Sequence, residues 1–452
     1  MHRFDELTER IARAVFAYTD ARLRLDPVPL DRAVDPATLA ELAPNPISAR
    51  GADPEAVMAT FEHVLAPAVI SCDSPRFLAF IPAAPTKASL LFDMVVSASS
   101  LSGVSWLEAA GAVHAENQAL RFLADLAGLG PTAGGCFVQG GSAGNLSALA
   151  VARDTARRRG APADRKLRVV VSGQAHSSVA STMRLLDVEP LVVPAPDDRL
   201  DGASIAAALD ADGDAASVCA VVATAGTTNA GIVDDLASIA EVCEREGIWL
   251  HVDAAYGGAA LLAPSVRSRF TGIERADSVV IDPHKWLYAP FDCAALLYRD
   301  PALARAVHTQ DASYLDVIHE EPDAWNPSDY AYHLTRRARG LPLWFSLAVH
   351  GTDAYRDAVE RVLATTRAAA ARIAAAPHLE LVREPELSIV LFRRHGWTGS
   401  DYEAWSRRLL EEQVAFVAPS RWHGEPVGRL AFLHPDTTPE IVDEVLAATR
   451  VP

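Results

Sequence analysis

Residues 248–258 read IWLHVDAAYGG, an apolar run that ends in a carboxylate and a series of small side chains. A short apolar run bounded by glycine is typical of a buried strand. Similar runs stand before and after it, and helical segments such as Gly144–Arg158 and Leu236–Glu246 separate several of them. The other predicted strands are Leu167–Val171, Val218–Ala223, Ser278–Ile281 and Ala294–Tyr298. Strands that alternate with helices predict an α/β fold built on a mainly parallel sheet.

The two ends of the chain differ from this central region. Residues 1–75 look helical and are interrupted by prolines around Pro27 and Pro44, so they predict a helical N-terminal segment. A long helical stretch, Asp353–Ala375, is followed by alternating strands and helices, which predict a smaller α/β domain over residues 353–452. Residues 76–352 are then expected to form the large domain.

Composition excludes several classes of protein. The 452 residues carry a formal net charge of −17, which argues against a nucleic acid or an anionic membrane surface as partner. No apolar run reaches the roughly 18 residues of a membrane-spanning helix. Five scattered cysteines without a C-x-x-C pair predict buried free thiols in a reducing compartment, and the spacing of His, Cys and carboxylates predicts no metal site. We therefore expect a cytoplasmic enzyme.

Lysine is so rare in this chain that each one deserves inspection. Only Lys87, Lys166 and Lys285 occur among 41 basic residues. Arginine supplies surface charge equally well, but it cannot supply an amine that loses its proton. Lys285 follows a predicted strand and lies between His284 and Trp286, where apolar surroundings favour a Schiff-base nucleophile. The alternative is a lysine at a domain edge whose ammonium group reaches solvent.

Three further clusters follow predicted strands of the large domain. The segment QGGSAGN, residues 139–145, precedes a helix and suits one phosphate group. Asp253 ends its strand, and His176 follows another. Each cluster alone has an ordinary structural explanation, as a glycine turn, a capping carboxylate or a structural histidine. Together with Lys285 they supply what pyridoxal phosphate requires, namely a phosphate cradle, a partner for the pyridine nitrogen and an amine.

On the segments QGGSAGNLSAL, QAHSSV, HVDAAYGG, DPHKW and DASYL, the chain resembles the group II pyridoxal-phosphate-dependent decarboxylases, which include the aromatic-L-amino-acid decarboxylases. The resemblance runs from about Ser74 to Phe345 and more loosely to the end. It implies fold type I, the fold of pyridoxal-phosphate-dependent transferases. It also implies a homodimer with active sites shared between the subunits.

The resemblance also implies a role for each matched residue. Lys285 would form the Schiff base, Asp253 would pair with the pyridine nitrogen and His176 would stack on the ring. The remaining cofactor-binding residues implied in this way are Gly141, Ser142, Thr228, Asp282 and His284. Tyr314, in the segment DASYL, would lie on a mobile loop and protonate the substrate carbon in the active site of the other subunit.

The predicted reaction is the decarboxylation of an L-amino acid to an amine and carbon dioxide. Phe80, Pro82 and Ala83 are predicted to line the substrate pocket. Cys72, Ala83 and Val104 depart from the aromatic enzymes, which carry large or hydroxyl side chains at these positions. We expect a neutral, bulky or aromatic substrate.

Three alternatives remain at this stage. One is decarboxylation coupled to oxidative deamination, which yields an aldehyde. Another is an aminotransferase, for which Arg429 is the only candidate to bind the α-carboxylate. The third is a non-catalytic regulatory protein that binds the cofactor.

Several basic and imidazole side chains have less specific interpretations. His251 is expected to point to the opposite side of its strand from Asp253 and to serve packing. Arg76 and Lys87 lie near the predicted pocket in sequence and are candidate cations for an acidic substrate. Three arginines have two alternative roles, either at a loop-to-helix junction or at a subunit interface. They are Arg336, Arg337 and Arg339.

Overall fold

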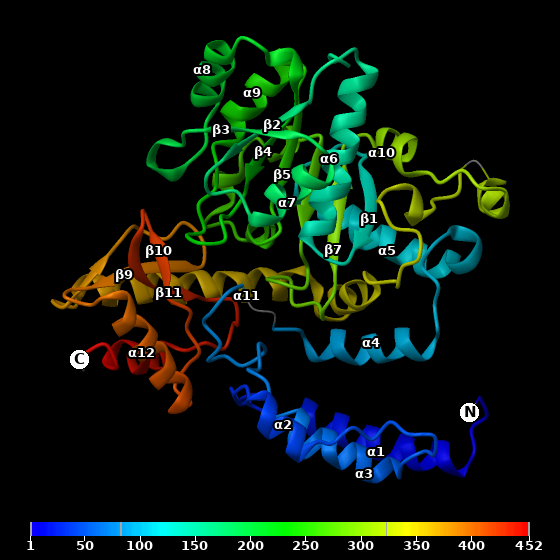
Figure 1. Ribbon diagram of the computed structural model, residues 1–452, viewed down its shortest axis with the longest axis vertical. Coiled ribbons are helices and arrows are strands. Elements are labelled where there is room, and N and C mark those ends of the chain that lie inside the picture. Colours follow the sequence, from blue (N-terminus) through cyan, green and yellow to red (C-terminus); the bar gives the residue numbers. More distant parts are fainter. Residues whose placement is uncertain (1, 82–83, 322, 451–452) are drawn as a thin grey trace.

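The computed structural model describes residues 2–81, 84–321 and 323–450, and its central feature is a seven-stranded sheet (Figure 1). The strand order is β1-β7-β6-β5-β4-β2-β3. Among the described strands of this sheet, six run in the same direction and β7 alone runs in the opposite direction. The mainly parallel α/β fold is therefore confirmed. The strands are β1 (Gly134–Val138), β2 (Arg168–Ser172), β3 (Glu189–Val193), β4 (Val218–Thr224), β5 (Trp249–Asp253), β6 (Ser278–Ile281) and β7 (Ala294–Tyr298).

Helices cover both faces of this sheet, and successive strand residues point into two separate cores. Val169 and Val171 contribute to the core beneath α6, α7 and α10, whereas Val170 between them contributes to the core beneath α5, α8 and α9. This alternation explains the continuous apolar runs in the sequence, because both faces of the strands are buried. The helices are α5 (Trp106–Leu126), α6 (Gly141–Arg158), α7 (Ser177–Leu185), α8 (Gly202–Asp212), α9 (Leu236–Glu246) and α10 (Pro301–His308).

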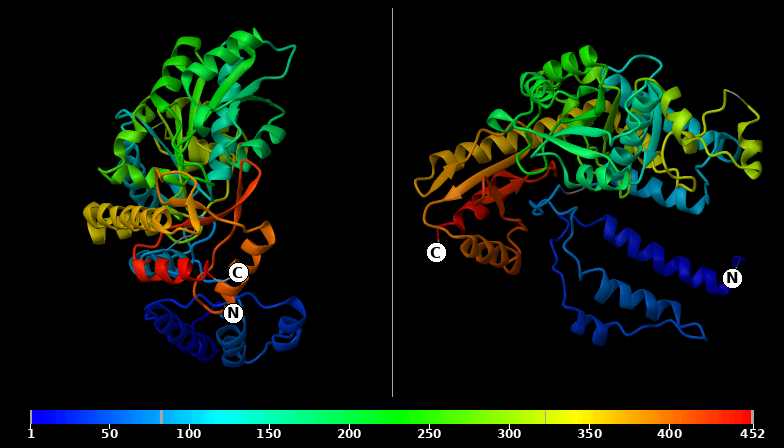
Figure 2. Two further views of the ribbon diagram at one scale, coloured as in Figure 1. Left: turned by 90° about the vertical axis from the view of Figure 1, so that its left-hand side faces the viewer. Right: turned by 45° about the horizontal axis from the view of Figure 1, so that its top comes forward.

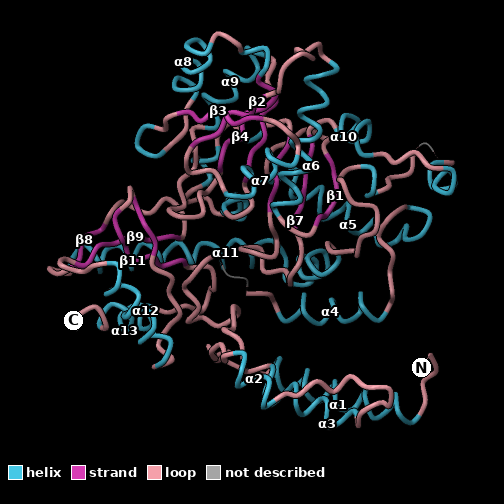
Figure 3. Tube along the Cα trace, viewed as in Figure 1, coloured by secondary structure: helices cyan, strands magenta, loops and turns pink. Residues whose placement is uncertain are grey.

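A second sheet of four antiparallel strands lies beside the first, as the magenta segments of Figure 3 show. Its order is β10-β11-β9-β8. The long helix α11 (Leu341–Ala375) reaches from the large sheet to the small one and is interrupted at Gly351, whose φ of 75° suits glycine. The other elements here are β8 (Leu379–Leu381), β9 (Ile389–Arg394), α12 (Gly399–Glu411), β10 (Ser420–Trp422), β11 (Glu425–Ala431) and α13 (Pro439–Ala447).

The N-terminal helices form a layer of their own, below α4 (Lys87–Ala98) in Figure 1 and apart from the sheets in Figure 2. They are α1 (Glu6–Leu23), α2 (Pro36–Leu42), α3 (Pro54–Thr60) and the following π-helical turn η1 (Phe61–Leu65). Among the described residues, these four elements contain no buried side chain. Leu7, Ile11 and Val15, spaced four apart on α1, are all exposed. This row of aliphatic side chains therefore has no cover among the described residues.

Short 3-10 turns connect the remaining elements. They are η2 (Pro196–Asp198), η3 (Ala215–Ser217), η4 (Gly257–Leu262), η5 (Arg267–Phe270), η6 (Ile273–Arg275), η7 (Ser313–His319) and η8 (Pro327–Asp329). Within the described part of the chain, no helix combines the length and the apolar character that crossing a bilayer requires. Four of the five cysteines are buried as predicted, whereas Cys72 is half-buried.

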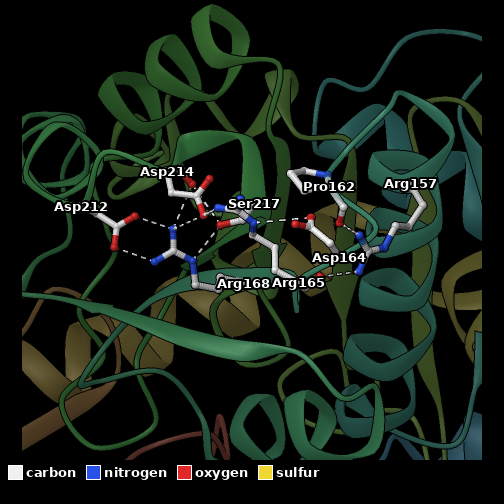
Figure 4. A network of polar contacts seen from close by, with 8 residues as sticks. All are labelled: Arg157, Pro162, Asp164, Arg165, Arg168, Asp212, Asp214 and Ser217. Carbon is white, nitrogen blue, oxygen red and sulfur yellow. Dashed lines mark hydrogen bonds and ion pairs between the residues drawn. The ribbon is translucent and has the colours of Figure 1, made fainter.

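A polar network joins the amino ends of β2 and β4, at the sheet edge opposite to the carboxyl ends of these strands (Figure 4). Arg168, at the start of β2, donates to Ser217 Oγ at 2.9 Å, to Asp212 Oδ1 at 2.6 Å and to the Asp214 carbonyl at 2.9 Å. Its side chain is only 16% exposed, whereas the neighbouring Arg165 side chain is 52% exposed. Arg168 therefore ties the end of α8 to the first residues of two adjacent strands.

We expect Arg168→Ala to lower the free energy of unfolding by roughly 1.5–3 kcal/mol, because it leaves half-buried acceptors without their charged donor. Arg165→Ala, in the same network but exposed, should cost less than about 1 kcal/mol. Urea denaturation of both variants measures the two losses. Equal losses would contradict the anchoring role of Arg168.

Candidate active site

A cavity of about 260 Å³ opens at the carboxyl ends of β4, β5 and β6, beside the first turns of α6 and α7. All eight residues predicted to bind the cofactor line it. The full lining is Gly140, Gly141, Ser142, Asn145, His176, Ser178, Thr224, Gly226, Thr228, Asp253, Ala255, Tyr256, Asp282, His284 and Lys285. Parallel strands place their ligands at this edge because the loops that follow them meet there. A larger cavity of about 900 Å³ lies between α1, α4, α11 and α13 and contains none of the predicted cofactor residues.

Asp253 is the last residue of β5, and its carboxylate is held in one orientation. Oδ2 accepts a hydrogen bond from Asn145 Nδ2 at 3.0 Å, and Oδ1 accepts one from the Ala255 N–H at 3.1 Å. The side chain is buried yet borders the cavity. A buried carboxylate with this few donors favours a ligand that brings a positive charge or a further N–H group.

Lys285 follows β6 and presents its amine beside a second buried carboxylate. Its Nζ lies 3.0 Å from Asp282 Oδ2, which also accepts the Gly141 N–H at 3.1 Å. Asp282 Oδ1 is buried without a hydrogen-bond partner among the described residues. Asp282 therefore joins the lysine to the start of α6 and keeps one acceptor open for a ligand.

The start of α6 lies so close to β6 that only small side chains fit. A Cβ atom at Gly141 would lie 3.1 Å from Ala255 Cβ, and one at Gly144 would lie 2.6 Å from Val280 Cγ2. These glycines bring the N-terminal end of α6 to the cavity, where the free N–H groups and the dipole of a helix favour a phosphate.

Two histidines border the cavity with one ring nitrogen already occupied. His176 precedes α7, and its Nδ1 accepts from the Ser178 N–H at 3.2 Å and contacts Ser178 Oγ at 2.8 Å. His284 Nδ1 accepts the Cys293 N–H at 3.0 Å. Burial lowers the pKa of His284, so its ring is neutral at physiological pH.

Arg429 on β11 connects the small sheet to two loops at the cavity. It donates to the carbonyls of Thr228 at 2.6 Å, Phe80 at 2.9 Å and Asn229 at 3.2 Å. The guanidinium is buried, and this burial lowers the pKa of Arg429 to about 10. Three backbone carbonyls thus occupy the arginine that was the sequence candidate for an α-carboxylate clamp.

Not every predicted residue reaches this cavity. Phe80 is 61% exposed and packs against Phe77 and Phe416 beside the site, and Pro82 and Ala83 lie outside the described residues. Tyr314 is 71% exposed on η7, in the yellow-green segment that projects beyond α10 at the right of Figure 1. Tyr314 is therefore not among the described residues that line this cavity.

The expectation for His251 was wrong. Side chains two residues apart on a strand share a face, so His251 and Asp253 point to the same side of β5. His251 Nε2 lies 2.9 Å from Asn145 Oδ1, and Asn145 binds Asp253. Asn145 itself was missed as a site residue. The alternation of side chains along β5 is the sequence signal for His251. The position of Asn145 near the start of α6 is the signal for Asn145.

The three arginines left open by the sequence organise the junction before α11. Arg336 pairs with the buried Glu116 at 2.8 Å and donates to the Gly103 carbonyl at 2.6 Å. Arg337 binds Asp93, and Arg339 binds Asp292. Of the two candidate cations for an acidic substrate, Arg76 pairs with Glu444, and Lys87 lines the larger cavity and not the cofactor cavity.

The fold and this cavity define an α/β protein built for pyridoxal phosphate. A family model described as the pyridoxal-dependent decarboxylase conserved domain matches residues 36–395, and the chain belongs to this family. It is therefore a pyridoxal-phosphate-dependent amino acid decarboxylase, a lyase. The free amine of Lys285, the carboxylate of Asp253 and the glycine-lined start of α6 fit the amine, ring nitrogen and phosphate requirements of that cofactor.

Individual relatives cover nearly the whole chain. The aromatic-L-amino-acid decarboxylase of Bacillus atrophaeus is 29% identical over 470 residues, which cover 98% of this chain and 94% of the relative. The L-2,4-diaminobutyrate decarboxylase of Rhizobium meliloti (strain 1021) is 33% identical over 388 residues, 83% of this chain and 77% of the relative. The crystal structure of Oryza sativa TDC with PLP and tryptamine superposes with a TM-score of 0.89 at 26% identity and covers 99% of this chain and 98% of that one.

The close approach of α6 to β6 is testable with a double-mutant cycle. Gly144→Ala should lower the free energy of unfolding by roughly 1–3 kcal/mol, because the new methyl group meets the stiff, fully buried Val280 side chain. Val280→Ala combined with Gly144→Ala should cost less than the sum of the two single changes. Urea denaturation of the four proteins measures this coupling, and strictly additive losses would contradict it.

Proposed function

We propose that this decarboxylase converts a neutral, bulky or aromatic L-amino acid to its amine and carbon dioxide, with Lys285 holding the cofactor as a Schiff base. The observation that supports this most is the convergence of Lys285, Asp253 and His176 around one cavity. An amine, a carboxylate and an imidazole at that spacing match the three contacts that the cofactor needs for Cα chemistry.

The substrate class follows from how the nearby charges are used. The described lining of the cavity contains no arginine, and Arg429 behind it is occupied by three carbonyls. An acidic side chain would therefore find no uncommitted cation there. Phe80, Phe77 and Phe416 form an aromatic cluster beside the Thr228 loop, which suits an apolar side chain.

Each catalytic group has a defined task in this scheme. Bound pyridoxal phosphate supplies a ring that accepts the electron pair left when carbon dioxide departs. Asp253 would hold a proton at the ring nitrogen, and His176 would cover the ring. The Lys285 amine would hold the cofactor. Tyr314 of the other subunit delivers the proton to Cα.

The absence of a cationic clamp is part of this scheme. A cation paired with the substrate carboxylate would stabilise the group that must leave, and it would oppose decarboxylation. Arg429 points to backbone carbonyls and takes no part in the cavity lining, and this favours a decarboxylase over an aminotransferase.

We further propose a homodimer. The apolar side chains Leu7, Ile11 and Val15 of α1 and the side chain of Tyr314 are exposed among the described residues, and a partner surface would cover them. A second copy of the chain supplies one in a two-fold arrangement, because each copy presents the same surfaces. Localisation in the cytoplasm is the natural counterpart of a chain whose cysteines are reduced.

The direct test is to incubate the cofactor-loaded protein in air with a pool of L-amino acids and to identify products by mass spectrometry. The expected product is one amine from a neutral, bulky or aromatic amino acid, without aldehyde or peroxide. An aldehyde with peroxide would assign the oxidative reaction instead. An amine from an acidic amino acid would contradict the substrate class.

Lys285→Ala should abolish the visible absorbance of the protein-bound Schiff base and reduce turnover by at least about a thousandfold, because no other amine lines the cavity among the described residues. Lys285→Arg is the matched control, since it keeps the positive charge but cannot form the bond. Absorbance and amine production are measured for both variants. Undiminished turnover in either variant would remove Lys285 from the mechanism.

Tyr314 and the dimer are tested together by mixing subunits. Lys285→Ala and Tyr314→Phe proteins are each expected to make little amine. When they are unfolded and refolded together, heterodimers combine an intact Lys285 site with the Tyr314 of the other subunit, so activity should return to about a quarter of wild type. No recovery in heterodimers isolated with two affinity tags would show that Tyr314 does not act across the interface.

A further inference from the structure

A chain of buried polar side chains runs beneath the cofactor cavity, and we call it the Asn145 network. It begins at Trp249 on β5, passes through Ser278 and His251 to Asn145, and there divides toward Asp253 and toward Ser178 with His176. Trp249 Nε1 donates to Ser278 Oγ at 2.8 Å, and Ser278 Oγ lies 2.8 Å from His251 Nδ1. Ser278 and His251 are completely buried, and Asn145 is 1% exposed.

The direction of the hydrogen bonds at Asn145 follows from counting its donors. The Nδ2 group has two hydrogens, and it lies 3.0 Å from Ser178 Oγ and 3.0 Å from Asp253 Oδ2. An ionised carboxylate only accepts, so the amide must point its nitrogen toward Asp253. Its oxygen then faces His251 Nε2 at 2.9 Å and must receive a hydrogen from it.

The protonation of His251 is fixed at both ring nitrogens. Nε2 carries the hydrogen donated to Asn145. Burial lowers the pKa of His251 to about 4, so the ring is neutral and Nδ1 accepts from the Ser278 hydroxyl. Ser278 is free to donate because Trp249, whose indole is a donor only, already fills one of its acceptor positions.

The other branch fixes His176 in the same way. Ser178 Oγ accepts a hydrogen from Asn145, so its own hydrogen is available to His176 Nδ1 at 2.8 Å. The Ser178 N–H points at the same nitrogen. Two donors at Nδ1 leave no room for a hydrogen there, so the ring carries its hydrogen on Nε2.

We propose that Asn145 is a positioning residue whose single amide aligns the Asp253 carboxylate and orients the Ser178 hydroxyl that donates to His176, with His251, Ser278 and Trp249 as its anchor. The inference rests on the proposed roles of Asp253 and His176 toward the cofactor. It adds that the group at the ring nitrogen and the group on the ring face are coupled through one side chain. A change at any anchor residue is then felt at both.

The first test measures tautomers in the cofactor-loaded wild-type protein by ¹⁵N NMR of labelled histidines, with signals assigned by single replacements. Both His251 and His176 are expected to carry hydrogen on Nε2 only. A hydrogen on Nδ1 of either ring would overturn the proposal. Repeating the measurement without cofactor separates it from the proposed function, because the network does not need the ligand to form.

The second test compares Asn145→Leu, which keeps the size of the side chain, with Asn326→Leu as control. Asn326 is also fully buried, but it binds Trp106 and Ile318 away from the cavity. Asn145→Leu should weaken pyridoxal phosphate binding by about tenfold to a hundredfold, because it removes a donor to a carboxylate. It should also shift the ¹⁵N resonance of His176 Nδ1, because the Ser178 hydroxyl loses the donor that orients it toward that nitrogen. The control should change neither reading.

Wild-type cofactor affinity and an unchanged His176 signal in Asn145→Leu would refute the coupling. If that variant fails to fold, Ser278→Ala decides the matter from the far end. His251 Nδ1 then loses its donor, so its ¹⁵N resonance should shift, whereas Nε2 keeps the hydrogen that it donates to Asn145. An unchanged His251 signal in Ser278→Ala would show that the anchor does not set the ring.

Discussion

The buried carboxylate of Asp282 is the contact on which the active site of this protein depends. A carboxylate that is 3% exposed is costly unless charged and polar partners surround it. Its Oδ2 finds two of them, the Lys285 amine at 3.0 Å and the Gly141 N–H at 3.1 Å. The turn after β6 and the start of α6 must therefore meet at one point. The absence of a side chain at Gly144 permits that approach, because Val280 fills the space beneath it.

The sheet supports this arrangement from the opposite edge. Its strands apart from the edge strand β3 are buried on both faces, so their register is set by two cores and leaves little freedom to slide. Arg168 joins the amino ends of β2 and β4 to α8, and the carboxyl ends of the neighbouring strands deliver Asp253 and Lys285. The network that stabilises the sheet and the residues that line the cavity thus lie at opposite ends of the sheet.

The sequence predicts the buried parts of this architecture better than the exposed ones. The strands Ser278–Ile281 and Ala294–Tyr298 and the helix Leu236–Glu246 have the predicted bounds, because continuous apolar runs or amphipathic spacing mark them. β3 was missed, since it is an edge strand with exposed residues and a proline, and β1 begins with two glycines. The residues proposed to bind the cofactor could be singled out because lysine, aspartate and glycine stand at strand ends, and they line one cavity. Asn145 and His251 were not singled out, because their importance lies in a hydrogen-bond direction that only coordinates reveal.

Some predicted residues do not reach the cavity in this chain, and they have one property in common, which is exposure to solvent. Phe80 and Tyr314 are exposed, and α1 has no buried residue among those described. A helix gains most of its stability from packing an apolar face, so an 18-residue helix with three exposed aliphatic side chains in register is incomplete alone. Tyr314 likewise does not line the cavity at which its proposed proton transfer takes place. In the proposed homodimer, a second copy of the chain would cover α1 and receive the Tyr314 loop. One assembly would thus provide both the packing surface and the proton donor.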